Sequence, residues 1–220
     1  MGKTALILGA TGLTGKLLLN RLLADEAYSK VKVFSRRALG LEHPKLEVYI
    51  GDLLKLDIFE SDFVGDEVFC CIGTTANKTK DKEVYKQIDF GIPVSAATLS
   101  KKNGINSFLV ISALGANAES RVFYNRTKGE MEVAVLNQHI PNTYILRPSL
   151  IKGYREETRM GEIMGGLLAS VASVFLFGKY KKYRAIKAET IANAMHHVVT
   201  SKPKAQIIES DKIEELGRLC

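Results

Sequence analysis

Short apolar runs alternate with stretches of helical periodicity along most of the chain. Apolar runs that stop at glycine or polar residues are typical of β-strands, and apolar positions three and four residues apart are typical of helices. The pattern predicts strands at residues 4–8, 31–35, 46–50, 67–72, 107–112, 143–146 and 206–209. It predicts helices at residues 13–25, 82–102 with a break near Pro93, 122–138 and 189–199, and a last helix near the C-terminus.

This alternation predicts the fold class. The strands are continuously apolar, which is typical of a parallel sheet that is covered on both faces. Right-handed crossovers then give an α/β, doubly wound, mostly parallel Rossmann sheet. We expect residues 1–220 to form a single domain. Residues 153–186 interrupt the alternation, so we expect them to form a small C-terminal substrate-side region over the carboxyl ends of the strands.

Composition and charge narrow the range of partners. The 220 residues are 46% hydrophobic and 25% charged, as in an ordinary globular protein, and carry a formal charge of +7. The basic residues are scattered, which indicates either a solvated surface or an attraction for phosphorylated ligands or acidic surfaces. No run of basic and aromatic residues reads as a nucleic-acid motif, so we expect no nucleic-acid partner.

Cysteine usage and the N-terminus point to the cytoplasm. The three cysteines, Cys70, Cys71 and Cys220, have neither metal-ligand spacing nor a disulfide pattern, so we expect reduced thiols and no metal site. A strand begins almost at the first residue, which leaves no room for a signal peptide. We therefore expect a cytoplasmic protein.

A glycine-rich segment separates the first predicted strand from the first helix. In that setting the first glycine permits a tight turn, the second lets the backbone approach a pyrophosphate, and the third allows close helix packing. The free amides at the helix N-terminus then attract the phosphates. The segment resembles a triphosphate-binding loop at Gly15-Lys16, but Leu17 replaces the hydroxyl that binds metal there. We expect dinucleotide binding by Gly9, Thr11, Gly12, Leu13, Thr14 and Gly15.

The end of the second strand indicates which dinucleotide binds. NAD-binding proteins place an acid there for the ribose hydroxyls, whereas this chain has Ser35, Arg36 and Arg37. Guanidinium groups suit a 2′-phosphate, so we predict NADP(H) in preference to NAD(H). Asp52 and Leu53 follow the third strand, where the Asp52 carboxylate can bind the adenine amino group.

A candidate catalytic group lies downstream. Tyr124 and Lys128 are four residues apart on a predicted helix and share a face, and Ser112 ends the fifth strand. A tyrosine with an ordinary pKa near 10 is a poor acid or base at neutral pH. We expect the Lys128 ammonium and the charge of the nicotinamide to lower the pKa of Tyr124. Lys128 can also hold the ribose, and Ser112 can bind a substrate carbonyl.

The chain resembles the atypical branch of the short-chain dehydrogenase/reductase superfamily. The resemblance rests on the glycine loop, Cys-Cys-Ile-Gly-Thr-Thr at 70–75, Tyr-Asn-Arg-Thr-Lys-Gly-Glu at 124–130 and Arg-Pro-Ser at 147–149, and these blocks are most similar to the Tat-interacting-protein-like oxidoreductases. It implies an NADP(H)-binding fold with Ser112, Tyr124 and Lys128 as catalytic residues. It also implies that the following residues line the cofactor: Ile72, Gly73, Thr74, Thr75, Arg147, Pro148, Ser149 and Leu150. The chain departs from the family at Ala113, where the human member of that group has a second serine, which removes one substrate contact.

These observations predict an NADP(H)-dependent oxidoreductase that acts on a small carbonyl or alcohol. Two alternatives stay open: a non-catalytic NADP(H)-binding regulatory or redox-sensing protein, and a nucleotide-sugar epimerase or dehydratase. The apolar stretch 163–177, with the basic residues 179–184 after it, indicates a buried helix or a subunit contact in a homo-oligomer. Weak contact of residues 163–184 with an anionic membrane surface is the further possibility.

Overall fold

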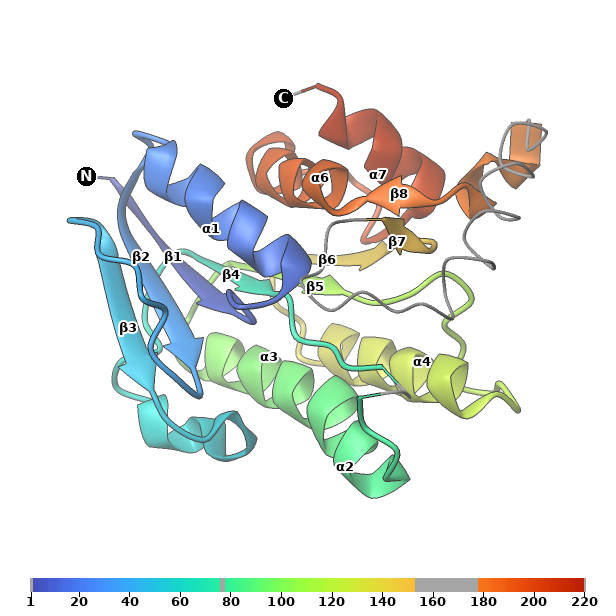
Figure 1. Cartoon of the computed structure of the whole chain (residues 1–220), viewed down its shortest axis with the longest axis horizontal. Helices are drawn as coiled ribbons and strands as arrows, with labels where there is room; N and C mark the ends of the chain where they lie inside the picture. Colours follow the sequence, from blue (N-terminus) through green and yellow to red (C-terminus); the bar gives the residue numbers. More distant parts are fainter. Residues whose placement is uncertain (1, 76–77, 153–177, 220) are drawn as a thin grey trace.

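A parallel β-sheet forms the centre of the protein (Figure 1). The computed structural model describes residues 2–75, 78–152 and 178–219. Within these residues the sheet has seven strands in the order β3-β2-β1-β4-β5-β6-β9, and every pairing is parallel. The strands are β1 (Lys3–Leu8), β2 (Tyr28–Ser35), β3 (Leu46–Ile50), β4 (Glu67–Cys70), β5 (Ser107–Ile111), β6 (Asn142–Arg147) and β9 (Ile207–Glu209).

Both faces of this sheet are buried, as the continuous apolar runs predicted. Neighbouring strand residues point to opposite faces. Ala5 and Ile7 of β1 belong to one apolar cluster, and Leu6 and Leu8 belong to the other. All four side chains have no exposed surface. The predicted α/β Rossmann class is therefore confirmed.

Two layers of helices cover the faces (Figure 1). On one face lie α1 (Leu13–Ala24), α6 (Ala188–Ser201) and α7 (Ser210–Gly217). The other face is covered by the 3-10 helix η1 (Leu53–Phe59), α3 (Ile92–Lys102) and α4 (Phe123–Leu136).

The strand order places a ligand site. The chain runs outward from β1 through β2 to β3 and then crosses back, so that β4 pairs with the other side of β1. In doubly wound sheets, ligands bind outside the carboxyl ends of the strands at such a switch point. The loops after β1 and β4 therefore mark the expected site.

The observed elements differ from the predicted ones in detail. The fourth strand ends at Cys70 rather than residue 72, and the thiols of Cys70 and Cys71 pack into opposite clusters. The helix expected at 82–102 is divided into α2 (Lys82–Lys86), a π-helical turn η2 (Gln87–Gly91) and α3. Pro93 has no N–H for the carbonyl of the residue four positions earlier, which accounts for a break here.

The substrate-side region is described in part. A two-stranded sheet of β7 (Ile151–Lys152) and β8 (Ile186–Lys187) and the 3-10 helix η3 (Gly178–Tyr183) were not predicted. The apolar stretch 163–177 lies outside the described residues. Across the described ranges, no helix combines the length and apolar character needed to span a bilayer.

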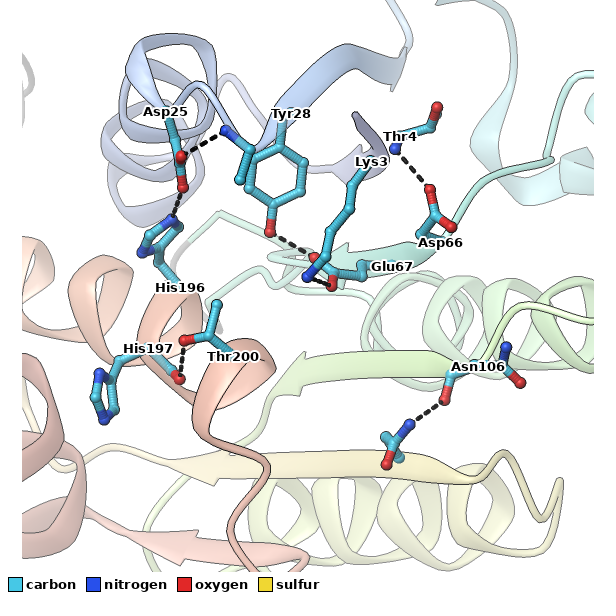
Figure 2. A network of polar contacts seen from close by, with 12 residues as sticks. Lys3, Thr4, Asp25, Tyr28, Asp66, Glu67, Asn106, His196, His197 and Thr200 are labelled. Carbon is cyan, nitrogen blue, oxygen red and sulfur yellow. Dashed lines mark hydrogen bonds and ion pairs between the residues drawn. The ribbon is translucent and has the colours of Figure 1, made fainter. Parts of the chain in front are cut away.

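A polar network joins the amino ends of β1, β2 and β4 (Figure 2). Glu67 of β4 accepts hydrogen bonds from Tyr28 Oη at 2.5 Å and from Lys3 Nζ at 2.7 Å. Beside it, His196 Nε2 of α6 lies 2.6 Å from Asp25 Oδ2 at the end of α1. This network lies at the opposite end of the strands from the switch point. It stabilises the sheet and does not enter the candidate site.

Candidate functional site

A cavity of about 340 Å³ opens at the carboxyl ends of β1, β2, β3 and β4. It is lined by residues at or after the carboxyl ends of these strands: Gly9, Thr11, Phe34, Ser35, Arg36, Arg37, Leu53 and Ile72. All but Phe34 were expected to bind a cofactor. The parallel strands thus bring together four segments that are far apart in the sequence.

The glycine loop has the geometry expected for a close backbone approach. Gly9 adopts φ +84°, which side chains other than glycine rarely adopt, and its carbonyl accepts from the Gly12 amide at 2.9 Å. A methyl group on Gly15 would lie 2.2 Å from the Gly9 oxygen. Gly12 precedes α1 without a side-chain cap, and Leu13 and Thr14 begin the helix. The unsatisfied amides of this first turn suit a phosphate.

The two arginines stand at the rim of the cavity. Arg36 and Arg37 are exposed, and within the described residues no carboxylate pairs with either guanidinium. Ser35 is buried, and its hydroxyl lies 3.4 Å from the Arg37 amide. Asp52, which we expected at the adenine, accepts a hydrogen bond from the Leu54 amide at 3.0 Å. The cavity therefore presents two uncompensated positive charges at the expected 2′-phosphate position.

A buried ion pair lies beside the loop that follows β4. Lys128 Nζ of α4 is 2.8 Å from Asp89 Oδ1 of η2, and the two side chains are 4% and 0% exposed. The other carboxylate oxygen, Oδ2, accepts from the Thr74 amide at 2.7 Å. A methyl group on Gly73 would lie 3.8 Å from Lys128 Nζ and 3.6 Å from Asp89 Oδ1. The expected cofactor loop therefore runs directly past this pair.

Tyr124 lies in the first turn of α4 and is 40% exposed. Its ring packs edge-on against Tyr85 at 6.3 Å between centroids. Burial raises the pKa of Tyr124, the Lys128 ammonium lowers it, and the Asp89 carboxylate raises it again. The net direction is upward, so the expected lowering by Lys128 is outweighed. The prediction overlooked the burial of the Tyr124 ring, which is the largest cause, and the charge of Asp89, which opposes that of Lys128.

Ser112, which we expected to bind a substrate carbonyl, is held by a buried carboxylate. Its hydroxyl donates to Glu132 Oε1 at 2.5 Å, and both residues are buried. Arg147 Nε donates to the same Glu132 at 2.9 Å, and Arg147 also pairs with Glu209 at 3.3 Å. The hydroxyl of Ser112 and the guanidinium of Arg147 are thus engaged in a network that joins α4, β6 and β9.

The other residues expected near the nicotinamide lie around this network. The Pro148 carbonyl accepts from the Leu114 amide at 2.9 Å. The Ser149 hydroxyl donates to the Arg184 carbonyl, and Leu150 is 61% exposed. On the other side of the site, the Thr74 hydroxyl lies 2.9 Å from that of Thr79, and the Thr75 carbonyl accepts from the Thr79 amide at 2.9 Å.

The sequence reading missed Asp89 and Glu132. Both carboxylates lie on the buried face of a helix. Asp89 is four residues after the buried Tyr85 and three before the buried Ile92, and Glu132 is four residues after the buried Lys128. Buried carboxylates need cationic or hydrogen-bonding partners. An acid at an apolar helical position was therefore the signal that could have found them.

Comparison with known proteins agrees with this geometry. A family described as NAD(P)H-binding matches residues 9–152. Protein HTATIP2 of Rattus norvegicus is 31% identical over 98% of this chain and 90% of its own length. The mitochondrial protein FMP52 of Meyerozyma guilliermondii is 28% identical over 97% of this chain and 95% of its own.

Solved structures share the fold at low identity. The UDP-N-acetylglucosamine 4-epimerase of Methanobrevibacter ruminantium aligns with a TM-score of 0.69 and 16% identity, over 94% of this chain and 76% of its own. The UDP-glucuronic acid 4-epimerase of Bacillus cereus, solved with NAD, aligns with a TM-score of 0.67 and 16% identity, over 93% and 77%. At this identity the likeness shows the fold alone.

Proposed function

The chain belongs to the NAD(P)H-binding family, and from this premise we propose that it is an NADP(H)-dependent oxidoreductase of the short-chain dehydrogenase/reductase type. Its substrate is a small carbonyl compound or alcohol. The observation that carries the proposal is that the glycine loop and Arg36 and Arg37 line the same cavity.

The residues of the cavity fit this cofactor. Because Gly9, Gly12 and Gly15 have no side chains, the loop presents its backbone amides to a pyrophosphate. Arg36 and Arg37 offer forked donors for a 2′-phosphate, and they stand directly after β2 in place of an acid that would bind a free ribose hydroxyl. This combination favours NADP(H) over NAD(H).

The catalytic roles follow from the groups on α4. When bound, the cofactor supplies or accepts a hydride at the nicotinamide. Tyr124 transfers the proton to or from the substrate oxygen, and its partial exposure leaves the phenol accessible to a substrate. Lys128 places a positive charge near that phenol and near the loop at Gly73. Ser112 is assigned to the Glu132 network, because its hydroxyl is already donated there.

The same Ser112 bond favours a second candidate, an NADP(H)-binding regulatory protein without turnover. A carbonyl-reducing site usually has a second donor beside the tyrosine, and here the expected donor is engaged. An epimerase or dehydratase remains the third class. It would retain its cofactor tightly and consume no NADPH overall.

A substrate screen distinguishes the oxidoreductase from the other two classes. Oxidation of NADPH is followed by its absorbance over a panel of small aldehydes and ketones, with Tyr124→Phe as the matched control. Turnover by the wild type that the variant lacks supports the oxidoreductase. Binding of NADPH without oxidation over the whole panel contradicts it and favours the two classes that consume no NADPH overall.

A further inference from the structure

We propose that Asp89 is a positioning residue for the Tyr124–Lys128 pair, holding the Lys128 ammonium charged and fixed beside the loop at Gly73 and Thr74. This inference rests on the proposed function for its chemical purpose, but its physical content can be tested without cofactor or substrate. No role was expected for Asp89 from the sequence.

Burial gives the first reason. Lys128 is 4% exposed, and an ammonium without water or a counter-ion loses its proton readily, because desolvation penalises the charged form. Burial alone lowers the pKa of Lys128, and Asp89 reverses this, so that the pKa lies above its ordinary value. The charge of Lys128 therefore depends on its neighbour.

Among the described groups that face Lys128, Asp89 is the one that carries a negative charge. Its ammonium faces Asp89 from η2, the Tyr124 phenol from its own helix, the Cys70 thiol from β4 and the Ile111 carbonyl from β5 at 3.5 Å. Burial raises the pKa of the Cys70 thiol to about 11 and also raises the pKa of Tyr124. Both are neutral at pH 7, so within the described surroundings Asp89 supplies the negative charge next to Lys128.

The backbone gives the second reason. Asp89 lies within the π-helical turn η2, and such turns are frequent at functional sites. One carboxylate oxygen reaches Lys128 and the other holds the Thr74 amide, so one side chain fixes both the cation and the cofactor loop. Asp89 also faces Tyr85 from α2, where burial and the Asp89 charge both raise the pKa of the phenol. Asp89 therefore holds the Thr74 amide as well as the Lys128 ammonium.

The Asp89→Asn substitution removes the negative charge and keeps the shape of the side chain. The amide oxygen of asparagine can still accept from Thr74, but the negative charge is lost. The cofactor-free protein is labelled with ¹³C at the lysine Cε, and the Lys128 resonance is assigned by its absence in Lys128→Arg. In the wild type we expect Lys128 to keep its proton beyond pH 10.4, the ordinary lysine value. In Asp89→Asn we expect its titration midpoint to fall by about two pH units or more.

Two variants control the experiment. Asp89→Glu keeps the charge and is expected to restore the high midpoint, whereas Asp57→Asn, on the exposed side of η1, is expected to leave it unchanged.

If Asp89→Asn does not fold, the wild-type titration decides. A wild-type midpoint at or below 10.4 overturns the inference. So does an Asp89→Asn midpoint equal to that of the wild type, or an Asp89→Glu protein that folds and titrates like Asp89→Asn. Failure to bind NADPH overturns the proposed function instead and leaves this titration standing.

Discussion

The hydroxyl of Ser112 donates at 2.5 Å to Glu132 Oε1, the same buried oxygen that accepts from Arg147 Nε at 2.9 Å. Ser112 stands where the sequence predicts a substrate contact, but in the structure it completes the hydrogen bonding of a buried carboxylate. Loss of a hydrogen bond to a buried charge is costly, because the charge is left incompletely solvated. This relationship leads to the first prediction.

Ser112→Ala is expected to lower the free energy of unfolding by about 1–3 kcal/mol and to leave turnover per folded molecule nearly unchanged. Tyr124→Phe is expected to do the opposite: stability stays close to that of the wild type, while turnover falls by about a hundredfold or more. Urea unfolding and NADPH oxidation with a substrate from the panel measure the two effects. A Ser112→Ala protein that is fully stable but inactive contradicts the structural assignment.

The glycine loop offers a matched pair of variants. A methyl group on Gly15 meets the Gly9 oxygen at 2.2 Å, whereas one on Gly12 lies 3.2 Å from the same atom. Gly15→Ala is therefore expected to destabilise the fold by about 3 kcal/mol or more. Gly12→Ala is expected to fold well and to lose NADPH affinity by about tenfold or more, because the added methyl obstructs the pyrophosphate. Equal stability losses for the two variants would show that the loop geometry is wrong.

The buried thiol of Cys70 predicts a loss of stability at alkaline pH. Burial raises its pKa from 9.0 to about 11. Below pH 9 the folded and unfolded chains both keep this proton; between pH 9 and 11 only the folded chain does, so stability falls as pH rises. The contribution over that window is about 2–3 kcal/mol. Urea unfolding of wild type and Cys70→Ala between pH 8.5 and 10.5 tests this, and the wild type is expected to lose stability more steeply. Parallel pH profiles would remove Cys70 from the explanation.

The sequence predicts most of the fold because its local signals agree with the global structure. The runs ending at Leu8, Ser35 and Ile50 are strands in the structure, with ends as predicted, and the glycine loop lies where the strand–helix junction predicts. These features are set by burial periodicity and by backbone freedom, and both can be read from neighbouring residues.

The parts that could not be predicted depend on contacts between distant segments. Asp89 and Lys128 are brought together by the packing of η2 on α4, and no local pattern specifies that the two meet. Ser112 and Glu132 meet for the same reason, so the sequence could identify the serine but not its partner. The short pairing of β7 with β8 is likewise set by the tertiary fold rather than by an apolar run.

The most direct test of the account is a fluorescence titration of the purified protein with NADPH and with NADH, repeated on Arg36→Ala/Arg37→Ala. Hydrogen bonds to charged groups contribute about 1.5–3 kcal/mol each, so the double variant is expected to lose NADPH affinity by about a hundredfold. Its affinity for NADH, which has no 2′-phosphate, is expected to change by less than about threefold. Tight binding of NADPH, weak binding of NADH and loss of the difference in the variant is the predicted result. Binding of neither cofactor by the wild type, or equal binding of both, would contradict the central claim.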